Sequence, residues 1–175
     1  MLDQRRSPFC SLYALAVAAG HTMRFKFQDD AVFFEAQNVL DSFQRKFMPI
    51  KRMWPLDVAQ GIGAFDFPGL QCTFELRLVE VQGGWDETCR CIKAFGGFLC
   101  VIVIAVFPTC SHTLVAQRVC EARPGLQCQN SHGTTMLPIF TVRPQHFHTA
   151  YIVDVRSVGM QPSEEWQVLS ALWDK

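Results

Sequence analysis

The sequence predicts an α+β protein, because stretches with helical character gather in the first half of the chain and strand-like stretches in the second half. The chain has 175 residues, of which 49% are hydrophobic and 18% charged, so it can form one sizeable hydrophobic core. We therefore expect a single domain over residues 1–175. Residues 1–70 should be mainly helical and residues 71–175 mainly β, with any chemistry in the groove between these two parts.

Three helices are expected in the first half. Phe9–Gly20 consists of strong helix formers, follows Pro8 and ends at a glycine suited to a C-terminal cap. Its apolar residues surround the helix axis, so this helix should be buried. A second helix is expected over Phe34–Phe47, where apolar residues recur at steps of three and four, and a third over Pro55–Gln60.

The second half alternates strands with one helix. Thr73–Val81 alternates apolar and polar residues like a half-buried strand, and Asp86–Phe95 should be a helix with Asp86 as its N-cap. The apolar run Phe98–Phe107 should be a strand buried on both faces, and Pro108–Gly133 should be a long loop. Further strands are expected over Ile139–Val142, Ala150–Val155 and Trp166–Leu169.

The charge balance excludes partners that are polyanions. Sixteen basic residues offset sixteen acidic ones, so no net field attracts the chain to nucleic acid or to an anionic membrane. The longest apolar run has ten residues, which is too short for a membrane-spanning helix. The opening Met-Leu-Asp-Gln-Arg-Arg is no export signal, so we expect a soluble intracellular protein, in the cytoplasm. A secretory or lysosomal origin stays open if the N-terminus has been trimmed.

Cys10 is the first candidate for chemistry, because it lies in the first turn of the expected buried helix. The unpaired N–H groups and partial positive charge at a helix N-terminus lower the pKa of a thiol. A base would have to come from a distant part of the chain. His146 and His148, just before the expected strand Ala150–Val155, are the candidates. Without a base, a cysteine in an apolar helix is more often an inert core residue.

The motifs around these residues resemble those of the papain-like cysteine peptidases. Asp3-Gln4 followed by Cys10–Ala14 resembles the Asp-Gln-Gly-x-Cys-Gly-x-Cys-Trp-Ala-Phe signature and keeps its six-residue step from glutamine to nucleophile. His148–Val155 resembles the strand that carries the family's histidine, and Trp166–Trp173 resembles its Trp-x-Val-Lys-Asn-Ser-Trp-Gly segment. The resemblance implies a papain-like two-lobed fold, with an N-terminal helical lobe and a C-terminal β lobe.

The resemblance also implies roles for individual residues. Cys10 would be the nucleophile and His148 the general base, with His146 as a bystander. Gln4 would stabilise the oxyanion, and Ser170 would replace the asparagine that orients the histidine. The implied reaction is hydrolysis of a peptide or isopeptide bond through a thioester, with a peptide or protein as substrate and no cofactor. The implied substrate-binding positions are Arg52 and Met53, where the family has a Gly-Gly pair, together with Trp54.

Departures from the family pattern support a different class of function. Ser11 replaces the tryptophan after the nucleophile, Arg52 replaces a glycine, and Ser170 is shorter and less directional than asparagine. The alternative is therefore a papain-fold protein that no longer cleaves and serves as a binding or assembly module for a protein partner. The retained Gln4, Cys10 and expected histidine favour the enzyme, which is our leading hypothesis.

The eight cysteines do not indicate a disulfide scaffold. Ser7 and Ser42 occupy two positions that the resembling family joins by a disulfide, and this paired loss is what a reducing compartment permits. The residues expected to be small core hydrophobes are Cys72, Cys91 and Cys100.

The expected loop carries the remaining candidate for a metal site. Its Cys110, Cys120 and Cys128 could pair or stay free, and with His112 and His132 they offer ligand types that zinc prefers. Their spacing fits no paired knuckle of the Cys-x-x-Cys kind, so we expect no metal here.

Overall fold

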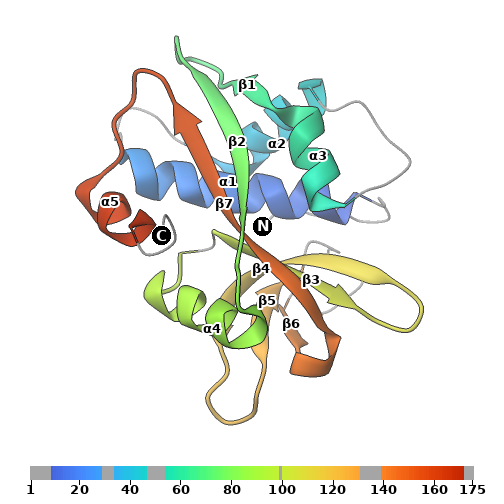
Figure 1. Cartoon of the computed structure of the whole chain (residues 1–175). Coiled ribbons are helices and arrows are strands. Elements are labelled where there is room, and N and C mark those ends of the chain that lie inside the picture. The colour runs from blue at the N-terminus through green and yellow to red at the C-terminus, as the bar shows by residue number, and fades with distance from the viewer. Residues whose placement is uncertain (1–8, 29–33, 47–53, 99, 131–138, 172–175) are drawn as a thin grey trace.

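A computed structural model describes residues 9–28, 34–46, 54–98, 100–130 and 139–171. These residues form five α-helices and one seven-stranded antiparallel sheet, which confirms the predicted α+β class (Figure 1). The helices are α1 (Cys10–Phe27), α2 (Ala36–Lys46), α3 (Pro55–Ile62), α4 (Gly84–Ala94) and α5 (Glu164–Ser170). The strands are β1 (Ala64–Asp66), β2 (Thr73–Glu80), β3 (Val101–Val106), β4 (Ser111–Val119), β5 (Leu126–Gln129), β6 (Ile139–Val142) and β7 (Phe147–Ser157).

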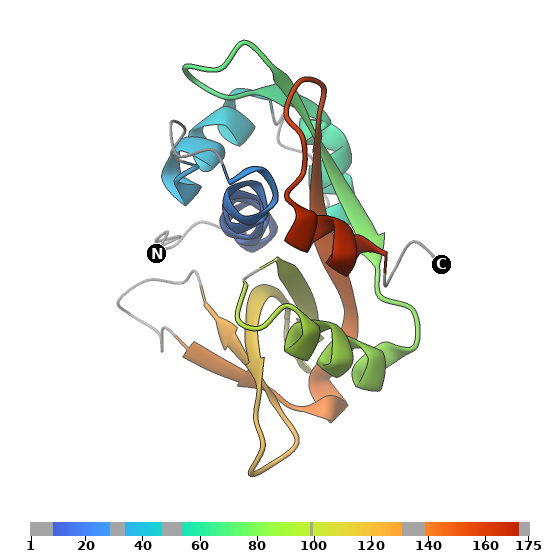
Figure 2. The ribbon, with the colours of Figure 1, turned by 90° about the vertical axis from the view of Figure 1, so that its left-hand side faces the viewer.

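The strand order β1-β2-β7-β3-β4-β5-β6 places the last strand of the chain in the interior of the sheet. β7 pairs with β2 along one edge and with β3 along the other. In Figure 1, α1, α2, α3 and β1 lie in the upper half of the molecule, while α4 and β3–β6 lie in the lower half. β2 and β7 connect the two halves, and Figure 2 shows the same division from the side.

The two faces of the sheet bury different parts of the core. Alternating side chains of one strand point to opposite faces, so Ile102 and Ile104 of β3 pack in the cluster around α1, whereas Val101 and Val103 pack in a second cluster. α4 and α5 contribute Ile92 and Trp166 to that second cluster. Helix α1 is therefore enclosed between the sheet and α2 and α3.

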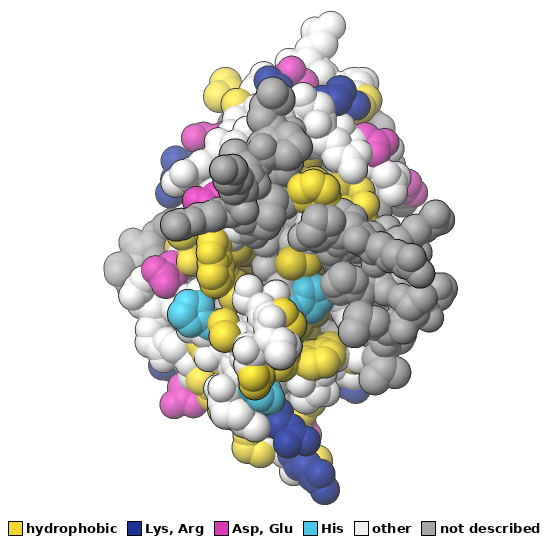
Figure 3. Space-filling model, turned by 90° about the vertical axis from the view of Figure 1, so that its right-hand side faces the viewer, with side chains coloured by type: hydrophobic (Ala, Val, Ile, Leu, Met, Phe, Trp, Pro, Cys, Tyr) yellow, Lys and Arg dark blue, Asp and Glu magenta, His cyan; other side chains and the backbone are white. Residues whose placement is uncertain are grey.

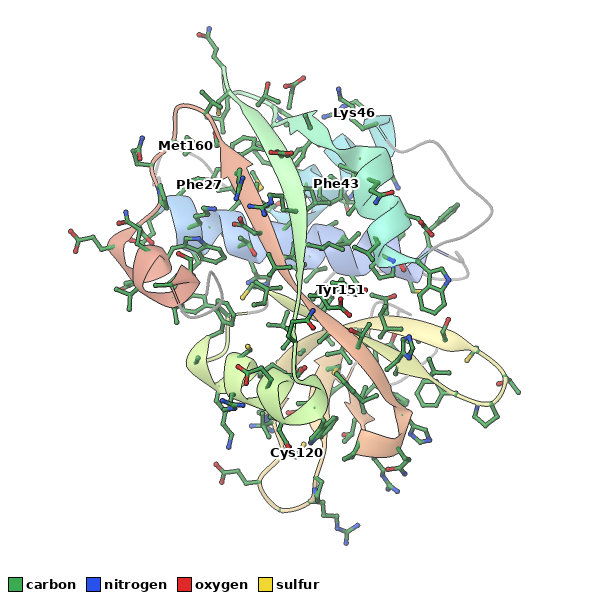
Figure 4. The ribbon with its side chains drawn as sticks, viewed as in Figure 1. Phe27, Phe43, Lys46, Cys120, Tyr151 and Met160 are labelled. Carbon is green, nitrogen blue, oxygen red and sulfur yellow. The ribbon has the colours of Figure 1, made fainter. Side chains whose placement is uncertain are left out.

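Helix α1 is buried, as predicted, but it is longer than Phe9–Gly20. Gly20 continues the helix rather than ending it, because it lies against the backbone next to α2. A side chain there would bring its Cβ to 3.3 Å from Cα of Ala36. The helix instead ends at Gln28, which adopts a left-handed conformation with φ of 43°. Phe27 of α1 and Phe43 of α2 belong to the same hydrophobic cluster, and both are labelled in Figure 4.

Polar contacts with β7 and α5 fix the C-terminal half of α1. Lys26 Nζ lies 2.6 Å from Asp154 Oδ1 and 5.0 Å from the ring centroid of Trp166. The Thr22 hydroxyl donates to the Val153 carbonyl at 2.7 Å. Ser163 connects α5 to the same end, since its side chain accepts the Trp166 N–H and donates to the Phe25 carbonyl. These contacts hold the helix in one position along the sheet.

Three sequence predictions about the second half are wrong. The expected loop Pro108–Gly133 contains β4 and β5, in which four consecutive residues of β4 are buried. Trp166–Leu169 is part of α5 and not a strand, because Ser163 caps a helix whose first turn carries Glu164 and Glu165. The N-cap of α4 is Gly83 rather than Asp86.

The other predicted elements are confirmed, with small shifts at their ends, since helices fray and their last turns are variable. None of the helices in the described ranges has the length and apolar character that a bilayer span requires.

We predict that Asp154→Ala lowers the free energy of unfolding by about 3 kcal/mol, because it leaves the buried Lys26 ammonium without its carboxylate. Urea denaturation followed by circular dichroism measures this change. Arg156→Ala is the control: Arg156 Nε is 4.0 Å from the other carboxylate oxygen and its side chain is largely exposed, so the loss should be below about 1 kcal/mol. Equal unfolding midpoints for Asp154→Ala and wild type would contradict the prediction.

Candidate active site

The site is built on the first residue of α1, Cys10. In Figure 1 this end of the helix lies on the right-hand side of the molecule. The N–H groups of the first turn have no partners within the helix, and the helix dipole adds partial positive charge there. Cys10 is half-buried, so the residue is neither fully exposed to water nor enclosed in the core. Both conditions suit a nucleophilic thiolate.

The partner of Cys10 is His112, the second residue of β4. The thiol and the imidazole are joined by a hydrogen bond. His112 Nε2 lies 2.9 Å from Oδ1 of Asn130, which directly follows β5 and is buried. Adjacent strands therefore carry the histidine and the amide, and α1 brings the cysteine to them. The result is a Cys10–His112–Asn130 triad.

The bond to Asn130 fixes the tautomer of neutral His112. An amide oxygen can only accept, so His112 Nε2 carries the proton and donates it. Nδ1 is then the nitrogen that remains for the sulfur of Cys10. In this state His112 can take the thiol proton at Nδ1 without turning its ring.

The electrostatics favour a thiolate beside a protonated imidazole. Burial by itself would raise the pKa of Cys10, but hydrogen bonds from His112 and Thr113 and the charge of His112 reverse the effect and lower this pKa below its usual value. Burial by itself would lower the pKa of His112, but its hydrogen bonds to Cys10 and Asn130 and the charge of Cys10 raise this pKa. The two pKa values therefore shift in opposite directions, and both shifts favour a thiolate beside a protonated imidazole.

Thr113 and Ser11 flank the pair on its buried side. Thr113 follows His112 in β4, and hydrogen bonds of its backbone and side chain are among the causes that lower the pKa of Cys10 against the opposing effect of burial. Its Oγ1 also lies 2.9 Å from Oγ of Ser11, the residue after Cys10. Neither residue was singled out in the sequence as part of the site.

His148 was predicted to be the base, but the structure brings His112 rather than His148 to Cys10. His148 is exposed at the start of β7, with its ring centroid 6.2 Å from that of Trp54. Ala105 of β3 pairs with Phe147 on one side and with His112 on the other, so β3 separates the two histidines. His146 packs instead against Phe107, with 4.9 Å between ring centroids.

Ser170 was predicted to orient the histidine, but the side chain that contacts His112 is that of Asn130. Ser170 ends α5, where its hydroxyl donates to the carbonyl of Gln167 at 3.1 Å. The predicted strand Trp166–Leu169 is part of helix α5. The segment therefore does not form the strand that the resemblance implied.

The remaining predicted site residues are only partly covered by the structure. Gln4, Arg52 and Met53 lie outside the described residues. Trp54 precedes α3 and is 41% exposed. Its contact with His148 places an exposed aromatic pair on this part of the surface. Figure 3 shows the side of the molecule on which α1 begins, where histidine and hydrophobic side chains lie close together and most charged side chains are peripheral.

All eight cysteines are free thiols. Cys100 is buried, as predicted, whereas Cys72 and Cys91 are half-buried. Ser42 donates to the carbonyl of Asn38 within α2, and Ser7 is outside the described residues.

The cysteines of the supposed loop do not gather around a metal. His112 belongs to the Cys10 site, and His132 lies outside the described residues. Cys110 is exposed and Cys128 is buried, and Cys120 lies in the lower part of the view in Figure 4. Across the parts of the chain that the structure describes, no three acidic, histidine or cysteine side chains are close enough to hold a metal ion.

Comparison with known proteins adds no relative, since no protein-family model, curated protein or solved structure matches the chain. The geometry of the site therefore carries the functional argument.

We predict that His112→Ala slows alkylation of Cys10 by iodoacetamide at least about tenfold at about pH 6. Without His112, burial is opposed by fewer donors, so the thiol pKa rises and less thiolate is present at that pH. The rate is measured for each cysteine by mass spectrometry of the digested protein across pH. His148→Ala is the matched control and should leave the Cys10 profile unchanged. A shift in the His148→Ala variant alone would reject the pairing of Cys10 with His112.

Proposed function

We propose that the protein is a papain-like cysteine peptidase that hydrolyses peptide or isopeptide bonds through a thioester. The Cys10–His112–Asn130 triad is the observation that carries the proposal. Cysteine at the start of a buried helix, with histidine and asparagine on strands that follow in this order, matches the roles known for the family. We extend the proposal to the papain-like two-lobed arrangement, with the helices of residues 9–70 on one side of the site and the strands of β3–β6 on the other.

The first half of the proposed reaction forms the thioester. The Cys10 thiolate attacks the carbonyl carbon, and the carbonyl oxygen becomes an oxyanion. When this intermediate collapses, the C–N bond breaks and protonated His112 gives its Nδ1 proton to the leaving amine. Asn130 accepts from Nε2 throughout and keeps the ring aligned.

The second half restores the enzyme. Neutral His112 takes a proton from water, whose oxygen attacks the thioester carbon. The C–S bond breaks, the acid product leaves, and the thiolate and imidazolium are formed again. In both halves, we propose that the backbone N–H of Cys10, at the start of α1, and Gln4 donate to the oxyanion.

The alternative to the peptidase is a papain-fold protein that binds a partner without cleaving it. Ser170 in place of asparagine favours that alternative, whereas the hydrogen bond between His112 and Asn130 supports the peptidase. Arg52 and Met53 lie outside the described residues, so the substrate-binding positions remain proposals together with Trp54. We further propose a reducing compartment, which the eight free thiols support.

We predict that an epoxysuccinyl inhibitor of papain-like enzymes alkylates wild-type protein at Cys10 and that Cys10→Ala abolishes this adduct. The epoxide reacts with an activated thiolate in a peptide-binding site. Labelling therefore tests both the activation of the Cys10 thiol and the binding of a peptide-like molecule beside it. Intact-mass measurement followed by peptide mapping identifies the adduct. Labelling of Cys110, which is exposed, to the same extent as Cys10 would contradict the proposal.

We predict that Asn130→Ala lowers hydrolysis of a denatured protein substrate by about tenfold or more. It also moves the alkaline limb of the pH profile to lower pH. The sign follows from His112, whose pKa is raised by Asn130: the protonated form that serves the leaving amine is lost at lower pH without the amide. Ser170→Ala is the matched control and should behave as wild type. If neither wild type nor control cleaves while Cys10 still binds peptide epoxide, the binding module is the better description.

A further inference from the structure

A cavity of about 1110 Å³ lies where α1, the C-terminal end of α4 and the end of β4 meet. It is separate from the Cys10 site, because the residue that α1 contributes to it is His21. At a rise of about 1.5 Å per residue, His21 is about 16 Å along the helix axis from Cys10. Pockets for small molecules have volumes of about 300 to 1000 Å³, so this cavity is large enough to hold one.

The inner lining of the cavity combines apolar side chains with two polar groups. Ile92 of α4 is buried and Val119 of β4 is half-buried, and together they provide an apolar surface. His21 and Gln117 are half-buried as well, and in the ranges that the structure describes neither side chain takes part in a hydrogen bond. Polar groups that are withdrawn from water usually have hydrogen-bond partners, and a ligand in the cavity would supply them.

Both polar groups are uncharged donors at neutral pH. Burial, together with the charge of Arg24, lowers the pKa of His21 to about 4, so its imidazole is neutral. A neutral imidazole has one N–H donor and one acceptor nitrogen, and the Gln117 amide also has groups of both kinds. The inner part of the cavity can therefore bind an amide or a carboxylate oxygen without adding charge of its own.

The charges at the rim favour an anion with a single charge. Lys93, Arg118 and Glu121 line the cavity and are exposed. Arg118 Nε donates to Gln127 Oε1, which orients the guanidinium and leaves its terminal nitrogens for a ligand. A guanidinium binds a carboxylate through two parallel hydrogen bonds. Because Glu121 offsets one of the two cations, a monoanion matches the rim better than a dianion does.

We propose that this cavity binds a small monocarboxylate that has an apolar body and an amide group. Its carboxylate accepts hydrogen bonds from Arg118, and Lys93 adds a second positive charge beside it. Its apolar body contacts Ile92 and Val119, which removes apolar surface from water on both sides. The competing explanation is that the cavity holds only water.

Titration of the full chain with N-acetylleucine, followed by ¹H–¹⁵N NMR, tests the proposal. This probe combines a carboxylate, an amide and an apolar side chain. We expect it to shift the backbone signals of Gly96, Gly97 and Cys120, which line the cavity; Cys120 is labelled in Figure 4. N-acetylleucinamide has no charge and should bind at least about tenfold more weakly, because it cannot form charge-assisted hydrogen bonds with Arg118.

Two variants change the charge of the rim in opposite directions. Arg118→Gln should weaken binding of N-acetylleucine about tenfold, since hydrogen bonds between charged groups are lost. Glu121→Gln should strengthen it about twofold, since a like charge is removed. Arg90→Gln is the matched control, because Arg90 of α4 pairs with Glu87 outside the cavity, and it should bind as wild type does.

Several results would overturn the proposal. These are unchanged signals from the cavity residues, equal binding of the acid and the amide probe, and equal losses in Arg118→Gln and Arg90→Gln. Circular dichroism checks that each variant folds. If Arg118→Gln does not fold, Glu121→Gln and the amide probe decide the question.

The inference goes beyond the proposed peptidase and does not depend on it. Cys10→Ala should bind N-acetylleucine as wild type does, because Cys10 does not line the cavity. If the probe shifts only the signals of Cys10 and His112, it occupies the candidate active site, and the cavity proposal is rejected. Failure of the cavity to bind the probe leaves the peptidase proposal unchanged.

Discussion

The position of α1 against β7 and β4 is the constraint on which the rest of the structure depends. The helix is buried on nearly all sides, so its polar groups must find partners inside the protein. Lys26 meets Asp154 at one end, Thr22 meets the β7 backbone in the middle, and Ser11 meets Thr113 at the other end. Each contact limits movement of the helix along the sheet. Cys10, the first residue of α1, is therefore held in a fixed position.

The chemistry is a consequence of how a buried helix end and a sheet edge meet. The helix N-terminus favours negative charge on the sulfur, and the strands supply an imidazole and an amide that face it. Burial opposes both charges, yet the hydrogen bonds among Cys10, His112, Thr113 and Asn130 outweigh it in each group.

The sequence predicted the first four helices, the central strands and the place of Cys10 at the start of a buried helix, because these depend on local composition and on one position in a helix. It did not predict β4 and β5, since Cys, Ser, His and Gly between Pro108 and Gly133 obscured the run Thr113–Ala116, whose four residues are all buried. That error hid His112 and Asn130 and left His148 as the base. A histidine that opens a run of apolar residues was the available signal, and both His112 and His148 satisfy it. Only tertiary structure separates them.

The interior place of β7 governs when the molecule can assemble. β7 lies between β2 and β3 in the sheet, and both of these strands come much earlier in the chain. β7 also carries the residues that form hydrogen bonds with Thr22 and Lys26. While residue 157 of a nascent chain is still inside the ribosome, β7 cannot pair with β2 and β3. The surface against which α1 packs is then incomplete. In such a chain, the Cys10 thiol does not yet have the His112 imidazole beside it. Long-range pairing of this kind folds late, so α1 and β4 reach their final positions only after synthesis has passed the last strand.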